Sequence, residues 1–219
     1  MKVKRFAQRK GCRRRAFTLI DLIVFVGFIV LLISILVPAL SRNKDRSHRI
    51  TCANNLGQIG GAFRTFALDS NDRYPMSVEA NKGGSLESLN TGDVFRHFQA
   101  MSNELSTPKI LLCPADLRNS VTNFLALANT NLSYFIGLDA NDSTPAMFLT
   151  GDRNLTNGTV LPPDRILIAT TDHPVGWNHE MHKFTGNVGL SDGSVQGITR
   201  SKLNKALRNS GVTNRLAIP

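Results

Sequence analysis

RRRAFTLIDLIVFVGFIVLLISILVPAL, residues 13–40, is the stretch that decides the architecture of this chain. Three arginines lead into an apolar segment from Phe17 to Leu40, whose only charged residue is Asp21. A helix of that length rises about 36 Å, which is enough to cross a hydrocarbon core about 30 Å thick. We therefore expect a membrane-crossing helix. Its carboxylate needs an explanation, because a charge inside a membrane is costly unless it is paired or has a function.

The positive charge of the chain is concentrated before this apolar segment. The formal net charge is +10, and residues 1–16 contribute +8 of it, with no acidic residue. Residues 41–49 add +3, Asp21 subtracts one, and residues 50–219 sum to zero. A neutral body has no charged surface that follows phosphates, so we expect no nucleic-acid partner. The basic excess before the segment predicts a cytoplasmic N-terminus, with everything from Ser41 onward outside the membrane.

Two export signals compete with the membrane-crossing helix. A secretory signal peptide has an apolar core of about 7–15 residues before a cleavage site of small residues. Val37-Pro38-Ala39 is acceptable as such a site, although the apolar core here is longer. Arg14-Arg15-Ala16-Phe17 has the arginine pair and the aromatic residue of a twin-arginine signal. Neither signal accounts for the carboxylate of Asp21.

The same residues resemble the N-terminus of type IV prepilins and type II secretion pseudopilins, which have a basic leader, a small residue, and then Phe-Thr-Leu-Ile and an acid. The resemblance implies that a prepilin peptidase cuts between Ala16 and Phe17 and methylates the new amino group of Phe17. It also implies that Asp21, the fifth mature residue, pairs with the N-terminal amine of a neighbouring subunit during assembly. The chain departs from the family in having Ala16 where Gly is usual and Asp21 where Glu is usual.

The helix is expected to continue to about residue 69. An apolar stripe with spacings of four, three, four and three supports this. The stripe consists of Cys52, Leu56, Ile59, Phe63 and Phe66. The expected division of the chain is a leader at 1–16, a transmembrane half-helix at 17–40, an extracytoplasmic half-helix at 41–69 and a globular domain at 70–219.

The globular domain is expected to be α+β, with a small antiparallel sheet packed on the long helix in a pilin-like arrangement. Helices are predicted over 91–105 and 201–209, and strands over 109–113, 132–138, 146–149 and 165–170. Asp192-Gly193 predicts a hairpin turn between strands at 187–190 and 194–198. Gly151-Asp152-Arg153-Asn154 is interpreted as a turn.

The resemblance to prepilin-like proteins extends into this domain through three elements. They are Cys52-Ala53-Asn54-Asn55-Leu56 leading to Tyr74-Pro75, then Cys113-Pro114-Ala115-Asp116, and the H-x9-D-G element formed by His182, Asp192 and Gly193. The resemblance supplies no role for the H-x9-D-G element. The hairpin turn is a sufficient physical reason for Asp192-Gly193, and His182 is expected to cap or hydrogen-bond nearby.

Three cysteines are present, and Cys12 would be lost with the leader. The remaining pair, Cys52 and Cys113, permits one disulfide in an exported domain. Two separately buried thiols are the alternative.

An alternative function is a membrane-anchored or exported periplasmic binding protein or metal-dependent hydrolase. Its site would use His173, His179, His182 and Asp192. Two of these histidines lie three residues apart, which allows them to share a helix face and a metal. The sequence His-Glu-Met-His is not the His-Glu-x-x-His motif, however, so a polar loop before the hairpin is the favoured interpretation.

An oxygen-rich loop is a calcium candidate, since some pseudopilins bind calcium in such loops. It contains Asp139, Asn141 and Asp142. The loop lacks the full EF-hand spacing and the bidentate acid at its end, so an Asx-rich β-turn is favoured. We expect no catalytic residues, and no cofactor beyond this calcium candidate.

These observations favour a non-enzymatic pilin-like or pseudopilin subunit of a type II secretion or type IV pilus-like filament. Its expected partners are the prepilin peptidase, other copies of itself and other pseudopilin subunits. Its expected location is the inner membrane, crossed once, with the globular domain in the periplasm, or at the cell surface if assembled.

Mass spectrometry of the membrane-extracted protein tests the processing. We expect a mature N-terminus at Phe17 that carries one extra methyl group, because the peptidase both cuts and methylates. A mature chain that begins after Ala39 would contradict this and would identify a soluble exported protein.

Overall fold

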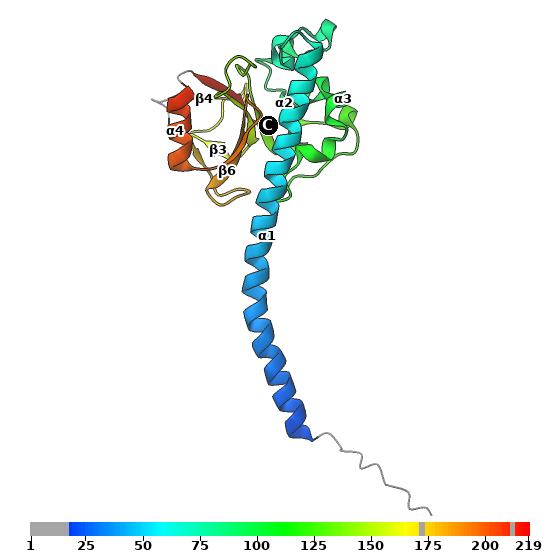
Figure 1. Cartoon of the computed structure of the whole chain (residues 1–219), viewed down its shortest axis with the longest axis vertical. Coiled ribbons are helices and arrows are strands. Elements are labelled where there is room, and N and C mark those ends of the chain that lie inside the picture. The colour runs from blue at the N-terminus through cyan, green and yellow to red at the C-terminus, as the bar shows by residue number, and fades with distance from the viewer. Residues whose placement is uncertain (1–17, 171–173, 211–212) are drawn as a thin grey trace, which may run out of the picture. The chain divides into compact units, whose positions relative to one another are not determined.

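The computed structural model describes residues 18–170, 174–210 and 213–219 (Figure 1). The chain divides into two compact units, residues 1–43 and residues 44–219. The long helix α1 (Leu19–Asp69) begins in the first unit and ends in the second.

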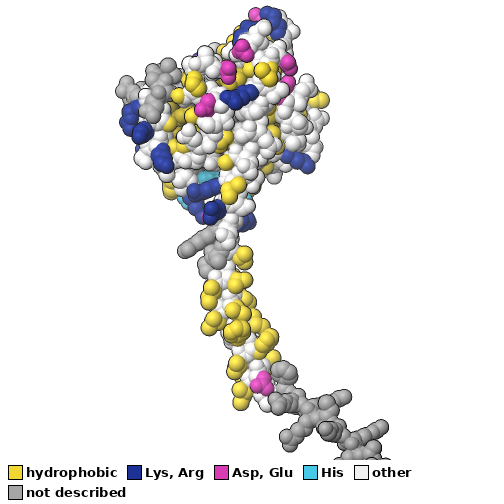
Figure 2. All heavy atoms as spheres, viewed as in Figure 1, with side chains coloured by type: hydrophobic (Ala, Val, Ile, Leu, Met, Phe, Trp, Pro, Cys, Tyr) yellow, Lys and Arg dark blue, Asp and Glu magenta, His cyan; other side chains and the backbone are white. Residues whose placement is uncertain are grey.

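Among its described residues, the first unit contains the apolar part of α1. Leu19–Val37 is long and apolar enough to cross a membrane, and none of these 19 residues is buried within the structure. Figure 2 shows hydrophobic side chains covering this part of the helix. By length and composition, this helix is suited to a membrane anchor or to a signal sequence near the N-terminus.

In the second unit, α1 packs its apolar stripe on the domain, as the spacing predicts. Cys52, Leu56, Ile59 and Phe63 are completely buried. They join one core with Tyr134, Ile136 and Leu149 of the sheet. The helix ends where Asn71 and Asp72 adopt positive φ angles of 56° and 57°, a conformation that Asn and Asp tolerate and that a helix cannot continue through.

The sheet confirms the α+β expectation. All pairings in its six strands are antiparallel, in the order β4-β8-β1-β2-β6-β7. The strands are β1 (Tyr134–Gly137), β2 (Phe148–Asp152), β4 (Ile166–Ala169), β6 (Thr185–Leu190), β7 (Val195–Thr199) and β8 (Asn214–Ala217). A separate two-stranded sheet pairs β3 (Leu155–Thr156) with β5 (Gly176–Trp177).

Alternate strand residues serve two cores, because successive side chains point to opposite faces of a sheet. Tyr134 and Ile136 lie in the core that α1 covers, whereas Phe135 lies in a second core. The second core includes Leu203 and Leu207 of helix α4 (Arg200–Ser210), which confirms the predicted terminal helix.

The remaining helical elements are short. The predicted helix over 91–105 is present as α2 (Val94–Ala100) and α3 (Ser102–Leu105), separated at Met101. The 3-10 helices are η1 (Pro75–Ser77), η2 (Ala80–Lys82), η3 (Leu86–Ser88), η4 (Pro108–Leu111), η5 (Phe124–Ala126) and η6 (Asn129–Asn131).

The structure corrects three sequence predictions. The strand expected over 109–113 is wrong, because Pro108 and the Thr107 side chain, which accepts a bond from the Lys109 N–H, start the helical turn η4 instead. The turn expected over 151–154 is wrong in its first half, since Gly151 and Asp152 belong to β2. Strand β8 escaped prediction because its pairing with β1 and β4 is non-local.

The buried apolar stripe of α1 should contribute strongly to the free energy of unfolding of the second unit. Leu56→Ala should reduce the free energy of unfolding by about 2–5 kcal/mol, because it leaves a cavity in a closed core. Leu68→Ala, on the same helix at 78% exposure, should change it by less than about 0.5 kcal/mol. Urea unfolding of the full chain in detergent, followed by the fluorescence of the single tryptophan Trp177, measures both. Equal losses would show that the stripe does not pack as described.

Candidate functional site: a buried cysteine–histidine cluster

Several predicted site residues lie outside the described part of the chain. These are Ala16 and Phe17 of the processing site and His173 of the alternative metal site. The processing prediction therefore stays a prediction.

Asp21 takes part in a reciprocal cap at the start of α1. The Thr18 N–H donates to Asp21 Oδ2 at 3.0 Å, and the Asp21 N–H donates to Thr18 Oγ1 at 3.2 Å. This is a capping box with an aspartate at its third helical position, and it satisfies two of the N–H groups that a helix start leaves unpaired. The Thr-x-x-Asp spacing is visible in the sequence, and our sequence reasoning missed it.

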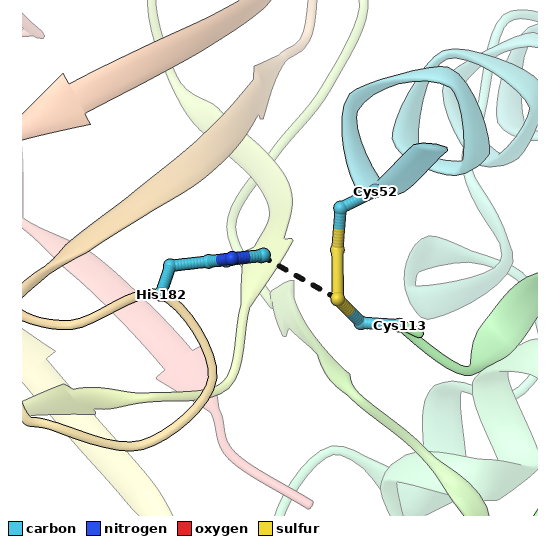
Figure 3. Close-up of side chains that lie close together, drawn as sticks. All are labelled: Cys52, Cys113 and His182. Carbon is cyan, nitrogen blue, oxygen red and sulfur yellow. Dashed lines mark hydrogen bonds between the residues drawn. A yellow bond between two sulfur atoms is a disulfide. The ribbon is translucent and has the colours of Figure 1, made fainter. Parts of the chain in front are cut away.

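The three prepilin-like elements of the globular domain each supply one residue to a single buried cluster (Figure 3). Cys52 comes from α1, Cys113 from the loop after η4, and His182 from the turn before β6. Their ligand atoms lie within 4.8 Å of one another, and all three residues are buried. Among the described residues, this is the only group of three or more potential metal-binding side chains.

The two cysteines are joined as a disulfide in the structure, with Cα atoms 5.3 Å apart. That separation is ordinary for a disulfide. The bond connects the long helix to the loop that begins the Cys-Pro-Ala-Asp element. His182 Nε2 lies 3.4 Å from Cys113 Sγ.

Further polar groups surround the cysteines, although the core around them is apolar. Cys52 Sγ lies 3.2 Å from the Tyr134 hydroxyl and 3.3 Å from Asp152 Oδ1. Asp152 is completely buried, and its Oδ2 accepts bonds from the backbone and side-chain nitrogens of Asn187, at 2.6 and 3.0 Å. His182 Nε2 lies 3.5 Å from the same Oδ2. The cluster therefore contains a carboxylate and a phenol in addition to its sulfur and imidazole groups.

Burial shifts the pKa values of the ionisable side chains beside the sulfurs, and it raises that of Tyr134. Burial raises the pKa of Asp152 to about 7, despite the opposing hydrogen bonds from Asn187. Burial, together with the nearby positive charge of Arg49, lowers the pKa of His182 to about 4. His182 is therefore a neutral imidazole at pH 7, with a lone pair available to a ligand.

Arg153, Asp116 and Glu180 form a network of ion pairs next to the cluster. Arg153, which follows Asp152, makes a bidentate pair with Asp116, at 2.7 Å from Nε and 2.9 Å from Nη2. Arg153 also pairs with Glu180 at 2.6 Å. Burial acts to raise the pKa of Asp116, but bonds from Arg153 and Ser133 outweigh it and hold that pKa below its ordinary value. The aspartate of Cys-Pro-Ala-Asp thus anchors the end of β2, where Asp152 lies.

The H-x9-D-G element contacts α1 at both of its ends. Arg49 Nη2 donates to the His182 carbonyl at 3.0 Å, and Arg64 donates to the Asp192 carbonyl. The step of fifteen residues from Arg49 to Arg64 rises about 22 Å in a helix, and the six residues of β6 rise about 20 Å in a strand. The nine-residue spacing therefore fits one strand that runs between two contacts on α1. The hairpin between β6 and β7 confirms the turn predicted at Asp192-Gly193, where Gly193 has a φ of 82°.

The other metal candidates are separated or engaged elsewhere. His179 is exposed and stacks edge-on with Phe184, and Asp192 lies in the hairpin turn, so neither joins His182 in the cluster. In the calcium candidate loop, both carboxylate oxygens of Asp139 bond to Arg215, at 2.6–3.1 Å. The Asn141 side-chain oxygen accepts bonds from Ser143 and Thr144 within the turn.

Comparison with known proteins finds distant and partial similarity to secretion-system proteins. The chain is 31% identical over 74 residues to type II secretion system core protein G of Pectobacterium carotovorum subsp. carotovorum, which is 34% of this chain and 47% of that protein. It is 36% identical over 67 residues to core protein G of Klebsiella pneumoniae, which is 31% of this chain and 47% of that protein. The chain thus spans about half the length of the relatives that it matches. No protein-family model matches the chain, and no solved structure matches it significantly. This distant similarity accompanies an apolar N-terminal helix and an α+β fold.

Breaking the Asp116–Arg153 ion pair should cost much more stability than breaking the exposed Asp93–Arg96 pair. Asp116→Ala should reduce the free energy of unfolding by about 3 kcal/mol, because it strands the largely buried Arg153 with only Glu180. Asp93→Ala, which breaks the exposed pair with Arg96, should cost less than about 1 kcal/mol.

Urea unfolding at pH 7 measures both variants. Because the folded pKa of Asp116 lies below its unfolded value, its contribution is present above the unfolded pKa and is lost as the pH falls through the folded one. The two variants should therefore converge in strongly acidic solution. Equal costs at pH 7 would contradict the anchoring role.

Proposed function

We propose that this chain is a pseudopilin-like subunit, processed after Ala16 and assembled through its apolar helix into a type II secretion or type IV pilus-like filament. The observation that carries the proposal is the exposed apolar helix Leu19–Val37 with one carboxylate at its start. The partial similarity to type II secretion system core protein G supports it independently. In this proposal, the prepilin peptidase is the first partner and other subunits are the later ones.

Assembly would transfer the apolar helix from lipid to a bundle of like helices. Its large hydrophobic side chains are exposed within the described part of the chain, and bundling in a filament would supply contacts for them. The helix start would then leave the polar boundary of the membrane, so the charge on Asp21 would need a partner of opposite sign. The methylated amine of a neighbouring Phe17 is such a partner.

The capping box is compatible with this pairing. The cap uses Asp21 Oδ2, and the side chain is exposed, so the other carboxylate oxygen can accept a bond from a neighbour's amine. The cap also holds the side chain over the helix N-terminus, where a negative charge is favoured before assembly. Aspartate, one methylene shorter than the usual glutamate, suits this cap, although its shorter reach brings the partner amine closer.

Variants at the helix start separate the cap from the pairing. Asp21→Ala and Asp21→Asn should both reduce cross-linked multimers at least tenfold, because both remove the charge. Thr18→Ala should assemble nearly as well as the wild type, because it weakens the cap and retains the charge. Asp21→Glu should assemble as well. Cross-linking in membranes followed by pull-down measures the multimers, and the mature mass confirms that each variant is still cut.

Normal assembly of Asp21→Ala would refute the pairing. If Asp21→Asn assembles while Thr18→Ala does not, the carboxylate acts only as a helix cap.

A further inference from the structure

We propose that Cys52, Cys113, His182 and Asp152 form a buried zinc-binding site, occupied when the two cysteines are thiolates and excluded when they are joined as a disulfide. Cysteine sulfur, imidazole nitrogen and carboxylate oxygen are the donors that zinc takes in tetrahedral sites. This inference concerns the globular domain and does not depend on filament assembly.

Two distances between donor atoms match the edges of a tetrahedron around one ion, and the donor atoms of Cys52, Cys113 and His182 lie within 4.8 Å of one another. With zinc–sulfur bonds of about 2.3 Å and zinc–nitrogen or zinc–oxygen bonds of about 2.0–2.1 Å, the edges of a tetrahedron are about 3.3–3.8 Å. The sulfur of Cys113 lies 3.4 Å from His182 Nε2, and the sulfur of Cys52 lies 3.3 Å from Asp152 Oδ1. Nε2 lies 3.5 Å from Oδ2, the other oxygen of the same carboxylate, so this distance is not an edge to the proposed donor Oδ1. Binding requires the two sulfurs to separate by a rotation of their short side chains.

The disulfide leaves one buried polar atom without a donor, and this favours a second state. Among the contacts of the described residues, the neighbour of Asp152 Oδ1 is Cys52 Sγ, which carries no hydrogen in a disulfide. A completely buried carboxylate oxygen without a donor or cation is costly. A zinc ion bound between the sulfur and this oxygen satisfies both atoms.

Residues around the four proposed ligands hold the ligand side chains in place, as the residues that hydrogen-bond to metal ligands do in zinc sites. Asn187 fixes Asp152 through Oδ2 and leaves Oδ1 directed at the sulfur. The Tyr134 hydroxyl, which accepts a bond from Asn55 Nδ2 at 3.3 Å, is placed to donate to the Cys52 thiolate. Arg49, bonded to the His182 carbonyl, adds positive charge beside a site whose ligands carry three negative charges when ionised.

A cavity of about 160 Å³ adjoins the histidine of the site, with Arg49, His182 and Asn187 among its lining residues. In this proposal, a hydrated ion enters the site through that cavity.

The chemistry balances in both states. Zinc binding converts two thiols into two zinc-bound thiolates and releases two protons. Disulfide formation also removes two protons, together with two electrons that pass to an oxidant, such as a protein disulfide that exchanges with the thiols. Because both reactions use the same two sulfur atoms, one chain cannot hold the zinc and the disulfide together.

Zinc analysis of the reduced full chain tests the proposal. The protein carries Cys12→Ser to remove the leader thiol, is purified in detergent, reduced with a phosphine and equilibrated with zinc. We expect one zinc per chain by elemental analysis, and none in the oxidised chain. Cys52→Ser and Cys113→Ser should abolish stoichiometric binding.

His182→Ala and Asp152→Asn should weaken zinc affinity at least tenfold, since even an outer-shell change costs about 10–100-fold. His179→Ala, which removes the exposed histidine three residues away, should bind like the wild type.

Cobalt substitution gives a readout that does not depend on how the variants fold. Cobalt in the reduced parent chain should show the visible bands of a tetrahedral ion and thiolate-to-cobalt charge-transfer absorption. Zinc well below one per reduced, folded chain would overturn the proposal. Stoichiometric zinc that survives loss of both cysteines, or a cobalt spectrum without thiolate absorption, would also overturn it.

Discussion

The packing of one face of α1 against the sheet is the constraint on which the second unit depends. The stripe from Cys52 to Phe66 brings the helix into one core with β1 and β2. That contact fixes where Cys52 lies, and Cys52 in turn determines which segments can reach it. Cys113 and His182 are far away in sequence, yet both arrive at the same level of the helix. The cluster is thus a consequence of the packing of the helix.

The three elements that resemble prepilin-like proteins acquire a common physical meaning in this arrangement. Cys-Pro-Ala-Asp supplies a cysteine to the cluster and, through Asp116, anchors Arg153 at the end of β2. H-x9-D-G supplies the histidine, and its length matches a strand between two contacts on α1. Polar groups that would be costly in an apolar core are instead gathered at one point, where they satisfy one another or a bound ion.

Patterns within a short stretch of sequence predicted the elements that form through contacts within that stretch. The stripe spacing predicts the helix to residue 69, Asp192-Gly193 predicts the β6–β7 hairpin, and the apolar pair Leu203 and Leu207 accompanies a terminal helix. Prediction failed over two segments for different reasons. Over 109–113 the reason is local: the segment is apolar enough for a strand, but Pro108 and the Thr107 cap start a helical turn. Over 151–154 the reason is non-local: the polar character of Asp152 suggested a turn, whereas its partners Asn187 and Cys52 are far away in sequence.

The sequence by itself determined the apolar N-terminal helix, the isolated acid at its start, the concentration of basic charge before it and the α+β class of the domain. These depend on composition and period along one segment of chain. Only the tertiary structure decided that Cys52, Cys113, His182 and Asp152 meet. Their meeting depends on the order of strands in the sheet and on the face that α1 buries, which is set by pairings between residues far apart in the chain.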